Sequence, residues 1–197
     1  MRFFISDNHF WHANVIKYCD RPFSSVEEMN EKMVQYWNEI VTQDDQVYYL
    51  GDFSMAFRSV ELFTNRLLGT KYLIAGNHDM CHSVHKKSRN PENKAKWIQK
   101  YIDNGFSSVK EEDFIEIDGI KFRMHHMPYQ NLEDKDARYQ NKRVTDDGIP
   151  LLHGHTHSKE KITLTKNGTI QIHVGVDAHN FWPISEQQVI ELYRSIV

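Results

Sequence analysis

The sequence predicts an α/β protein in which short buried strands alternate with helices. Five short apolar runs, rich in β-branched and aromatic residues, each end on a polar group that contains histidine, aspartate or asparagine. Helix-like spacing of apolar residues separates the first runs, and hairpin-like turns join the later ones. This succession of elements indicates layers of sheet and helix.

The apolar runs are short enough to be strands. They lie, in order, at residues 3–5, 47–50, 72–75, 121–124 and 149–152. Hairpins are expected at residues 113–124, around an Asp-Gly turn, and at residues 161–174, around an Asn-Gly turn. The polar stretch 128–148 is expected to form a long surface loop of the kind that often carries function.

Three helices are predicted between the strands. In residues 25–41 the apolar residues recur every three or four positions, and a serine with a glutamate three positions later is typical of a helix N-terminus. A second helix is expected over 59–68 and ends at a glycine. A third opens at an Asn-Pro pair and runs over 90–105. The tail from residue 185 fits either a helix or a turn that leads to a strand.

Length and charge limit the class of protein. The chain has 197 residues, and we expect a single domain over residues 1–197. A net charge of −3 does not indicate a nucleic-acid or membrane surface. No apolar run approaches the ~20 residues of a membrane span, so no membrane partner is expected. Cys19 and Cys81 lack C-x-x-C spacing, which favours a reducing, cytoplasmic location.

Histidine is the unusual component of the chain, because its twelve residues fall in clusters. α/β proteins build their sites from polar residues at the ends of strands. Five strand ends carry such groups here: Asp7 with His9, Asp52, Asn77 with His78, His125 with His126, and His155 with His157. Each group on its own is more often a turn than a metal site. All five together indicate a metal centre.

The order of these groups resembles that of the calcineurin-like metallophosphoesterases. The motifs are D-x-H at residues 7–9, G-D at 51–52, G-N-H-D at 76–79, a later histidine, and G-H-x-H at 154–157. The segments Arg-Pro-Phe at 21–23 and Val-Asp-Ala at 176–178 are similar to those of smaller bacterial and phage members. The resemblance implies a four-layer α/β/β/α sandwich with two metal ions above the strand ends.

The resemblance also assigns ligands. It implies that one metal ion is held by Asp7, His9, Asp52 and His157. It implies that Asp52 bridges to a second ion, which is also held by Asn77, His126 and His155. His126 is preferred to His125 because the family's ligand is commonly followed two residues later by proline, here Pro128. His125 stays the alternative, and the resemblance gives His153 no ligand role.

Oxygen and imidazole donors without a thiolate suit Mn²⁺, Fe or Zn²⁺. We expect two divalent metal ions, with manganese first and iron, zinc or nickel as alternatives. Only Asp7 and Asp52 in the ligand set are anionic, so two divalent ions leave the site positive and suited to a phosphate ester. Two such ions ~3.5–4 Å apart can activate a bridging hydroxide for in-line attack on phosphorus.

Three further residues are expected to act on the substrate. The resemblance places His78 over the phosphate, where it stabilises the transition state or protonates the leaving oxygen. The aspartate that supports this histidine in phosphoprotein phosphatases is missing from the stretch GDFSMA at 51–56. His12 and Arg21 are expected to reach the substrate phosphate, although Arg21 also fits the anchor of a turn.

These residues predict a binuclear metal-dependent phosphohydrolase that cleaves a small phosphodiester, with a nucleotide as the first expectation. A phosphomonoesterase or a nuclease on the same site stays an alternative, and a nucleic-acid partner is not indicated by the charge. A catalytically idle binding scaffold would have lost ligand residues, yet every motif is intact. The sequence does not indicate an oligomeric state.

Overall fold

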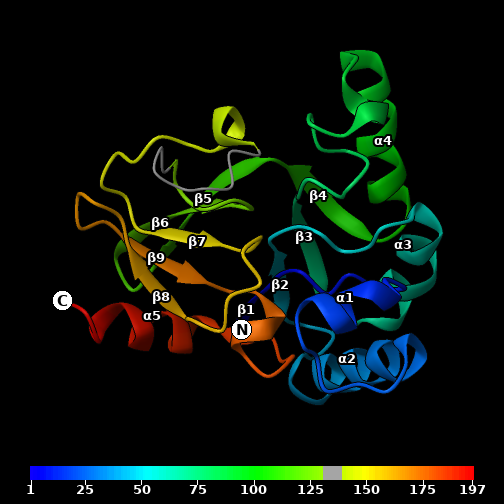
Figure 1. Cartoon of the computed structure of the whole chain (residues 1–197), viewed down its shortest axis with the longest axis horizontal. Helices are drawn as coiled ribbons and strands as arrows, with labels where there is room; N and C mark the ends of the chain where they lie inside the picture. Colours follow the sequence, from blue (N-terminus) through cyan, green and yellow to red (C-terminus); the bar gives the residue numbers. More distant parts are fainter. Residues whose placement is uncertain (131–138) are drawn as a thin grey trace.

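The computed structural model of the chain describes residues 1–130 and 139–197, and it contains two five-stranded sheets packed face to face (Figure 1). The first sheet consists of β1 (Arg2–Ile5), β2 (Gln46–Tyr49), β3 (Thr70–Ile74), β4 (Phe106–Lys110) and β10 (Ile184–Ser185), in the order β10-β1-β2-β3-β4. The second consists of β5 (Glu112–Ile117), β6 (Ile120–His125), β7 (Leu151–His153), β8 (Ile162–Leu164) and β9 (Ile170–His173), in the order β5-β6-β7-β9-β8. The predicted α/β class is confirmed.

The helices lie on both sides of the pair of sheets. They are α1 (Ala13–Tyr18), α2 (Val26–Ile40), α3 (Phe57–Phe63), α4 (Pro91–Asp103) and α5 (Glu186–Arg194). Short 3₁₀ turns lie at η1 (Thr64–Arg66), η2 (Lys86–Ser88), η3 (Gln140–Lys142) and η4 (Val176–Ala178). Helices α1 to α4 accompany the first sheet, and α5 runs along the second sheet near the C-terminus (Figure 1).

Alternation along the strands produces two apolar cores. In β1, Phe3 and Ile5 join the core under the first helices, whereas Phe4 points into the core that the two sheets share. Met124 of β6 and Val189 of α5 belong to that shared core. Because both faces of the first sheet are buried, its strands are apolar on successive residues, which is why they read as short continuous runs.

The helix predictions are confirmed with changes at their ends. Helix α2 begins after Ser25, whose side chain accepts the Glu28 N–H at 3.1 Å. The expected second helix is split into α3 and η1, and it is closed by Gly69 at φ +81°. Helix α4 begins at Pro91 after an Asn90 cap.

The ambiguous tail is helical, because Ser185 and Gln188 form a capping box at the start of α5.

Both hairpins are present. Asp118 and Gly119 have φ of 54° and 75°, the left-handed pair that a tight hairpin turn requires between β5 and β6. β8 and β9 form the second hairpin. Helix α1 and strand β4 were not predicted. Part of the expected long loop, residues 131–138, lies outside the described residues.

The topology brings the C-terminal ends of six strands together. β1, β2 and β3 are parallel in one sheet, and β6, β7 and β9 are parallel in the other. A parallel bridge between Ser6 and Gly175 joins the ends of β1 and β9 across the two sheets. The motif residues follow these ends. Across residues 1–130 and 139–197, no helix has both the length and the apolar character needed to cross a bilayer.

Candidate metal centre

The turns that follow the strands hold their polar residues in strained backbone conformations. Positive φ angles occur at Asp7 (62°), His9 (52°), Asp52 (56°), His155 (71°) and His157 (51°). Such conformations cost side-chain-bearing residues on the order of 1–3 kcal/mol each and gather at functional sites. The strain indicates that these five side chains are aimed for a purpose other than stability.

Two glycines let the turns approach one another. A Cβ at Gly76 would lie 2.3 Å from Oδ1 of Asp52, and a Cβ at Gly154 would lie 2.4 Å from Oδ2 of Asp7. Any side chain at either position would displace a carboxylate. The glycines of the G-N-H-D and G-H-x-H motifs are therefore required for close packing around the two aspartates.

The first donor group consists of Asp7, His9 and His157, whose candidate ligand atoms all lie within 4.8 Å of one another. Asp7 is fully buried, and the His9 and His157 rings lie 5.0 Å apart between centroids. Neither ring nitrogen of His9 has a hydrogen-bond partner within the described part of the chain. A buried imidazole nitrogen without a partner costs free energy, and a metal ion at this point would satisfy it.

The second donor group consists of Asp52, His126 and His155, again within 4.8 Å of one another. Nδ1 of His126 lies 2.7 Å from the Leu50 carbonyl oxygen, to which it donates, so Nε2 is the nitrogen left for a ligand. That Nε2 lies 3.2 Å from Oδ1 of Asn77. The arrangement groups Asn77 with the second set of donors.

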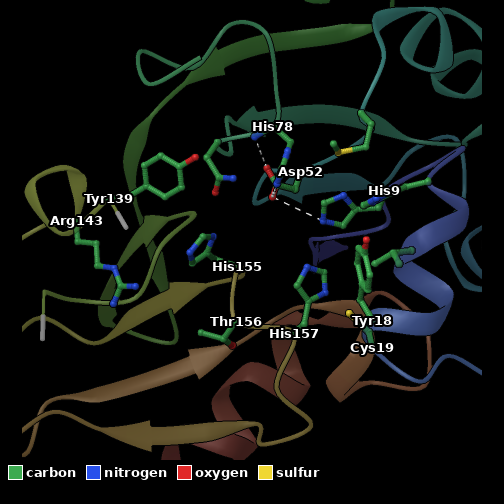
Figure 2. Close-up of a pocket in the computed structure, with 14 residues that line it drawn as sticks. His9, Tyr18, Cys19, Asp52, His78, Tyr139, Arg143, His155, Thr156 and His157 are labelled. Carbon is green, nitrogen blue, oxygen red and sulfur yellow. Dashed lines mark hydrogen bonds and ion pairs between the residues drawn. The ribbon is translucent and has the colours of Figure 1, made fainter. Parts of the chain in front are cut away.

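Asp52 lies between the two donor groups. Its Oδ2 is 3.7 Å from Nε2 of His9 and 3.3 Å from Nε2 of His126. Its Oδ1 accepts the backbone N–H of His78 at 2.8 Å, which fixes the plane of the carboxylate (Figure 2). One carboxylate thus faces both candidate metal positions, as a bridging ligand must.

A cavity of about 630 Å³ opens above these donors. Its wall contains the expected substrate residues His12 and His78, together with Asp52, Asn77, His155 and His157. Figure 2 shows Tyr18 and Tyr139 on opposite sides of the cavity, with His155 and His157 between them. No pattern in the sequence marked either tyrosine, Arg143 or Thr156, all of which line the cavity.

Comparison with known proteins decides the family. The model of the calcineurin-like phosphoesterase superfamily domain matches residues 2–176. The chain belongs to this superfamily. An uncharacterised protein of Methanocaldococcus jannaschii is 33% identical over 196 residues, which cover 96% of this chain and 89% of that protein. The gene 66 protein of Mycobacterium phage D29 is 32% identical over 192 residues, covering 93% and 92%.

A solved structure supports the same fold. A protein of unknown function from Aquifex aeolicus has a TM-score of 0.68 and 22% identity, and the match covers 98% of both chains. The family match over residues 2–176 confirms the resemblance read from the motifs. Membership in the calcineurin-like phosphoesterases implies metal-dependent phosphoester hydrolysis and divalent metal ions, for which the two donor groups are candidates.

The last residue of the G-N-H-D motif, Asp79, holds the turns of this phosphoesterase site together. Asp79 is fully buried and accepts the backbone N–H groups of Asp52, Phe53 and Gly76 at 2.9, 3.2 and 2.8 Å. Burial and the neighbouring Asp52 carboxylate raise the pKa of Asp79 to about 7. Asp79 ties the turn after β2 to the turn after β3.

Arg21, expected either to reach the substrate phosphate or to anchor a turn, is buried in the structure. Its side chain has no exposed surface, and its guanidinium donates to both carboxylate oxygens of Asp177 at 2.8 Å. It also donates to the backbone oxygens of Asp7 and Asn8. With these bonds made, Arg21 faces the protein and not the cavity, which fits the anchor of a turn better than a contact with substrate.

Asp177 extends this support to a predicted ligand. Its Oδ2 accepts from Nδ1 of His157 at 2.8 Å, which leaves Nε2 of His157 facing Oδ1 of Asp7 at 4.0 Å. Carboxylates that hold the far nitrogen of a ligand histidine are a common feature of metal sites. Arg21, Asp177 and His157 form a chain of hydrogen bonds that orients one predicted ligand.

We expect Asp177→Asn to weaken metal binding by roughly 10- to 100-fold, because it loses the charge that holds His157 and Arg21. The measurement is metal affinity by competition with a chromophoric chelator, followed by activity at saturating metal. Activity that recovers at high metal concentration fits a positioning role. Unchanged affinity would remove Asp177 from the support of the site.

The second-group histidine is distinguished from its neighbour by direction. His125 continues β6 and its Nδ1 lies 2.9 Å from the Met127 carbonyl oxygen, away from the donor groups. We expect His126→Ala to remove one metal ion and most of the turnover, and His125→Ala to keep both. Metal analysis of the two variants side by side tests this, and the reverse result exchanges their roles.

Charge around the donors makes metal binding depend on pH. Burial lowers the pKa of His126, but the Asp52 carboxylate outweighs it and raises the pKa to about 9. Burial likewise lowers the pKa of His157, but its hydrogen bond to Asp177 raises the pKa to about 10. In the metal-free protein both rings therefore hold a proton at neutral pH.

We expect metal binding at pH 7 to release about two protons, because each nitrogen must be deprotonated to bind. The number should fall as pH rises through about 9 and about 10. In the metal-free protein, these raised pKa values add to the free energy of unfolding. The contribution has its full size below pH ~6.5, and it is lost as pH rises through about 9 for His126 and about 10 for His157. Calorimetric titration in buffers of different protonation enthalpy counts the protons. An equal count at pH 7 and above pH 10 would contradict these protonation states.

Proposed function

We propose that the protein is a binuclear metal-dependent phosphodiesterase that cleaves a small phosphodiester, with a nucleotide as the substrate class. The observation that carries the proposal is the position of Asp52, whose Oδ2 lies within 3.7 Å of a ligand nitrogen in each donor group. A bridging carboxylate is what two divalent ions on one substrate phosphate require. Oxygen and imidazole donors favour manganese, with iron, zinc and nickel as alternatives.

The cavity supports a small diester over a protein or a long polymer. Its volume of about 630 Å³ lies in the range of small-molecule sites. Tyr18 and Tyr139 stand on opposite sides of the donors, so each of the two substituents of a diester has an aromatic wall (Figure 2). A nucleoside base stacks on such a ring at a gain of ~1–3 kcal/mol. A monoester would use only one of these walls.

The metal ions, His78 and His12 have different proposed roles at the substrate phosphate. When bound, the two metal ions supply Lewis acidity and an activated water. His78 reaches the cavity with a side chain that is 40% exposed, and its ring packs edge-on against His9 at 5.4 Å between centroids. It is placed to donate a proton to the leaving oxygen. His12 lines the same wall and is proposed to contact the substrate.

The test is hydrolysis of bis-(p-nitrophenyl) phosphate beside p-nitrophenyl phosphate, on protein stripped with a chelator and reloaded with Mn²⁺. Metal-restored cleavage of the diester, with two ions bound per chain, supports the proposal. A preference for the monoester would make the protein a phosphomonoesterase. Inactivity of protein that binds no metal would overturn the assignment. We further propose a reducing, cytoplasmic location, since Cys19 and Cys81 are both unpaired.

A further inference from the structure

A third cluster of donor atoms adjoins the predicted metal centre and contains sulfur. Candidate ligand atoms of Cys19, His157 and Asp177 all lie within 4.8 Å of one another. Cys19 follows the last turn of α1 and is held there by its N–H, which donates to the Val15 carbonyl oxygen at 2.9 Å. Its thiol is partly exposed and lines the cavity beside His157 (Figure 2). An ion that enters the cavity can therefore reach it.

The donor chemistry of this cluster differs from that of the two predicted groups. The two predicted groups offer only oxygen and imidazole nitrogen, which suit Mn²⁺ as well as iron or zinc. Cys19 adds a thiolate to one imidazole and one carboxylate, the combination of donors that zinc prefers. An ion that prefers sulfur ligands gains a metal–thiolate bond at this cluster, whereas manganese gains little from it.

The two arrangements compete for the same side chains. His157 belongs both to the first donor group and to the sulfur cluster. In the first, its Nδ1 is bonded to Asp177 and its Nε2 faces Asp7. An ion at the sulfur cluster takes Asp177 as a ligand, which breaks the hydrogen bond that orients His157 and withdraws the carboxylate from Arg21. Occupation of one position weakens the other.

We propose that Cys19, His157 and Asp177 form a second, sulfur-containing metal site that takes a soft divalent cation such as Zn²⁺ or Cd²⁺ and competes with the first donor group for His157. When the ion binds, the Cys19 thiol and the His157 ring nitrogen that becomes a ligand each release a proton to solvent, and sulfur–metal and nitrogen–metal bonds form. We therefore expect excess zinc to inhibit phosphodiester hydrolysis by the manganese-loaded protein. This inhibition rests on the proposed phosphodiesterase function, whereas the binding does not.

The binding test uses Cd²⁺, because cadmium–thiolate bonds absorb in the near ultraviolet. Manganese-loaded protein of residues 1–197 is titrated with Cd²⁺ as wild type, as Cys19→Ser and as Cys81→Ser. Cys81 is the matched control, since it is the other free cysteine and is buried. We expect the absorption in wild type and Cys81→Ser and its loss in Cys19→Ser. If Cys81→Ser does not fold, Cys81→Ala replaces it. Equal absorption in Cys19→Ser, or none in wild type, overturns the site.

The inhibition test measures diester hydrolysis at fixed Mn²⁺ against rising Zn²⁺. We expect Cys19→Ser to keep the activity of wild type without zinc and to need at least ~10-fold more Zn²⁺ for half inhibition. The same zinc sensitivity in both proteins overturns the competition. Should no variant hydrolyse the diester, the proposed function fails, and the cadmium absorption still decides whether the sulfur site exists.

Discussion

Replacing Asp52 by asparagine is expected to abolish phosphodiester hydrolysis and to lower the metal content from two ions to one or fewer. The buried carboxylate faces His9 and His126 with one oxygen and accepts the His78 N–H with the other. An amide can keep the bond to His78 only by turning its NH₂ group toward the metal positions. The change also removes one of the two anionic ligands. Losing several kcal/mol of metal-derived stabilisation corresponds to ~10³-fold or more in kcat/KM.

The measurement combines metal analysis with single-substrate kinetics on bis-(p-nitrophenyl) phosphate. Asp113→Asn is a suitable control, since its carboxylate pairs with Lys110 at the start of the second sheet. Circular dichroism checks that the fold is kept. In the metal-free variant His126 loses the charge that raises its pKa to about 9, so that ring should become neutral at pH 7. Near-normal turnover with two bound ions would remove Asp52 from the site.

The candidate site residues whose grouping in space could be predicted from the sequence are those that follow strands directly. Asp7, Asp52 and His126 each come one or two positions after an apolar run, and parallel strands bring such positions to one edge. Their grouping follows from local pattern and topology together. The direction of His126 also follows from strand alternation. Met124 points into the shared core, and His126, two residues later, lies on the same face of the strand, whereas His125 lies on the opposite face.

The supporting residues were not predictable in the same way. Arg21 and Asp177 are 156 positions apart in the sequence, and they meet only because β9 ends beside β1. An arginine next to proline and phenylalanine has the same appearance whether it binds substrate or anchors a turn. Its full burial, which decides between the two, is a property of the tertiary structure. The same holds for Cys19 beside His157.

Element ends show the same division between local and distant causes. Helix α2 was predictable because its cap and its apolar spacing lie within one segment. The tail was ambiguous because β10 is only two residues long, pairs with β1 and leads directly into helix α5. Helix α1 has six residues and buries Val15 alone, too little for an apolar pattern to appear.

His78→Ala is expected to keep both metal ions and to lose turnover. Asp52 is held by the backbone N–H of residue 78, so truncation of the side chain leaves that 2.8 Å bond intact. What disappears is the imidazole in the cavity, whose Nε2 lies 4.0 Å from Oδ2 of Asp52. A donor to the leaving oxygen is worth ~10²–10⁴-fold in rate.

The leaving group separates acid catalysis from simple stabilisation of charge. With thymidine 5′-(p-nitrophenyl) phosphate, nitrophenolate leaves without a proton, whereas an alkoxide leaving group needs one. If His78 supplies that proton, His78→Ala should lose much more activity on a dialkyl diester than on the nitrophenyl ester. A similar loss on both would mean that the imidazole stabilises the phosphoryl oxygens instead. Loss of a metal ion in this variant would make His78 a ligand, because the bond that fixes Asp52 does not involve its side chain.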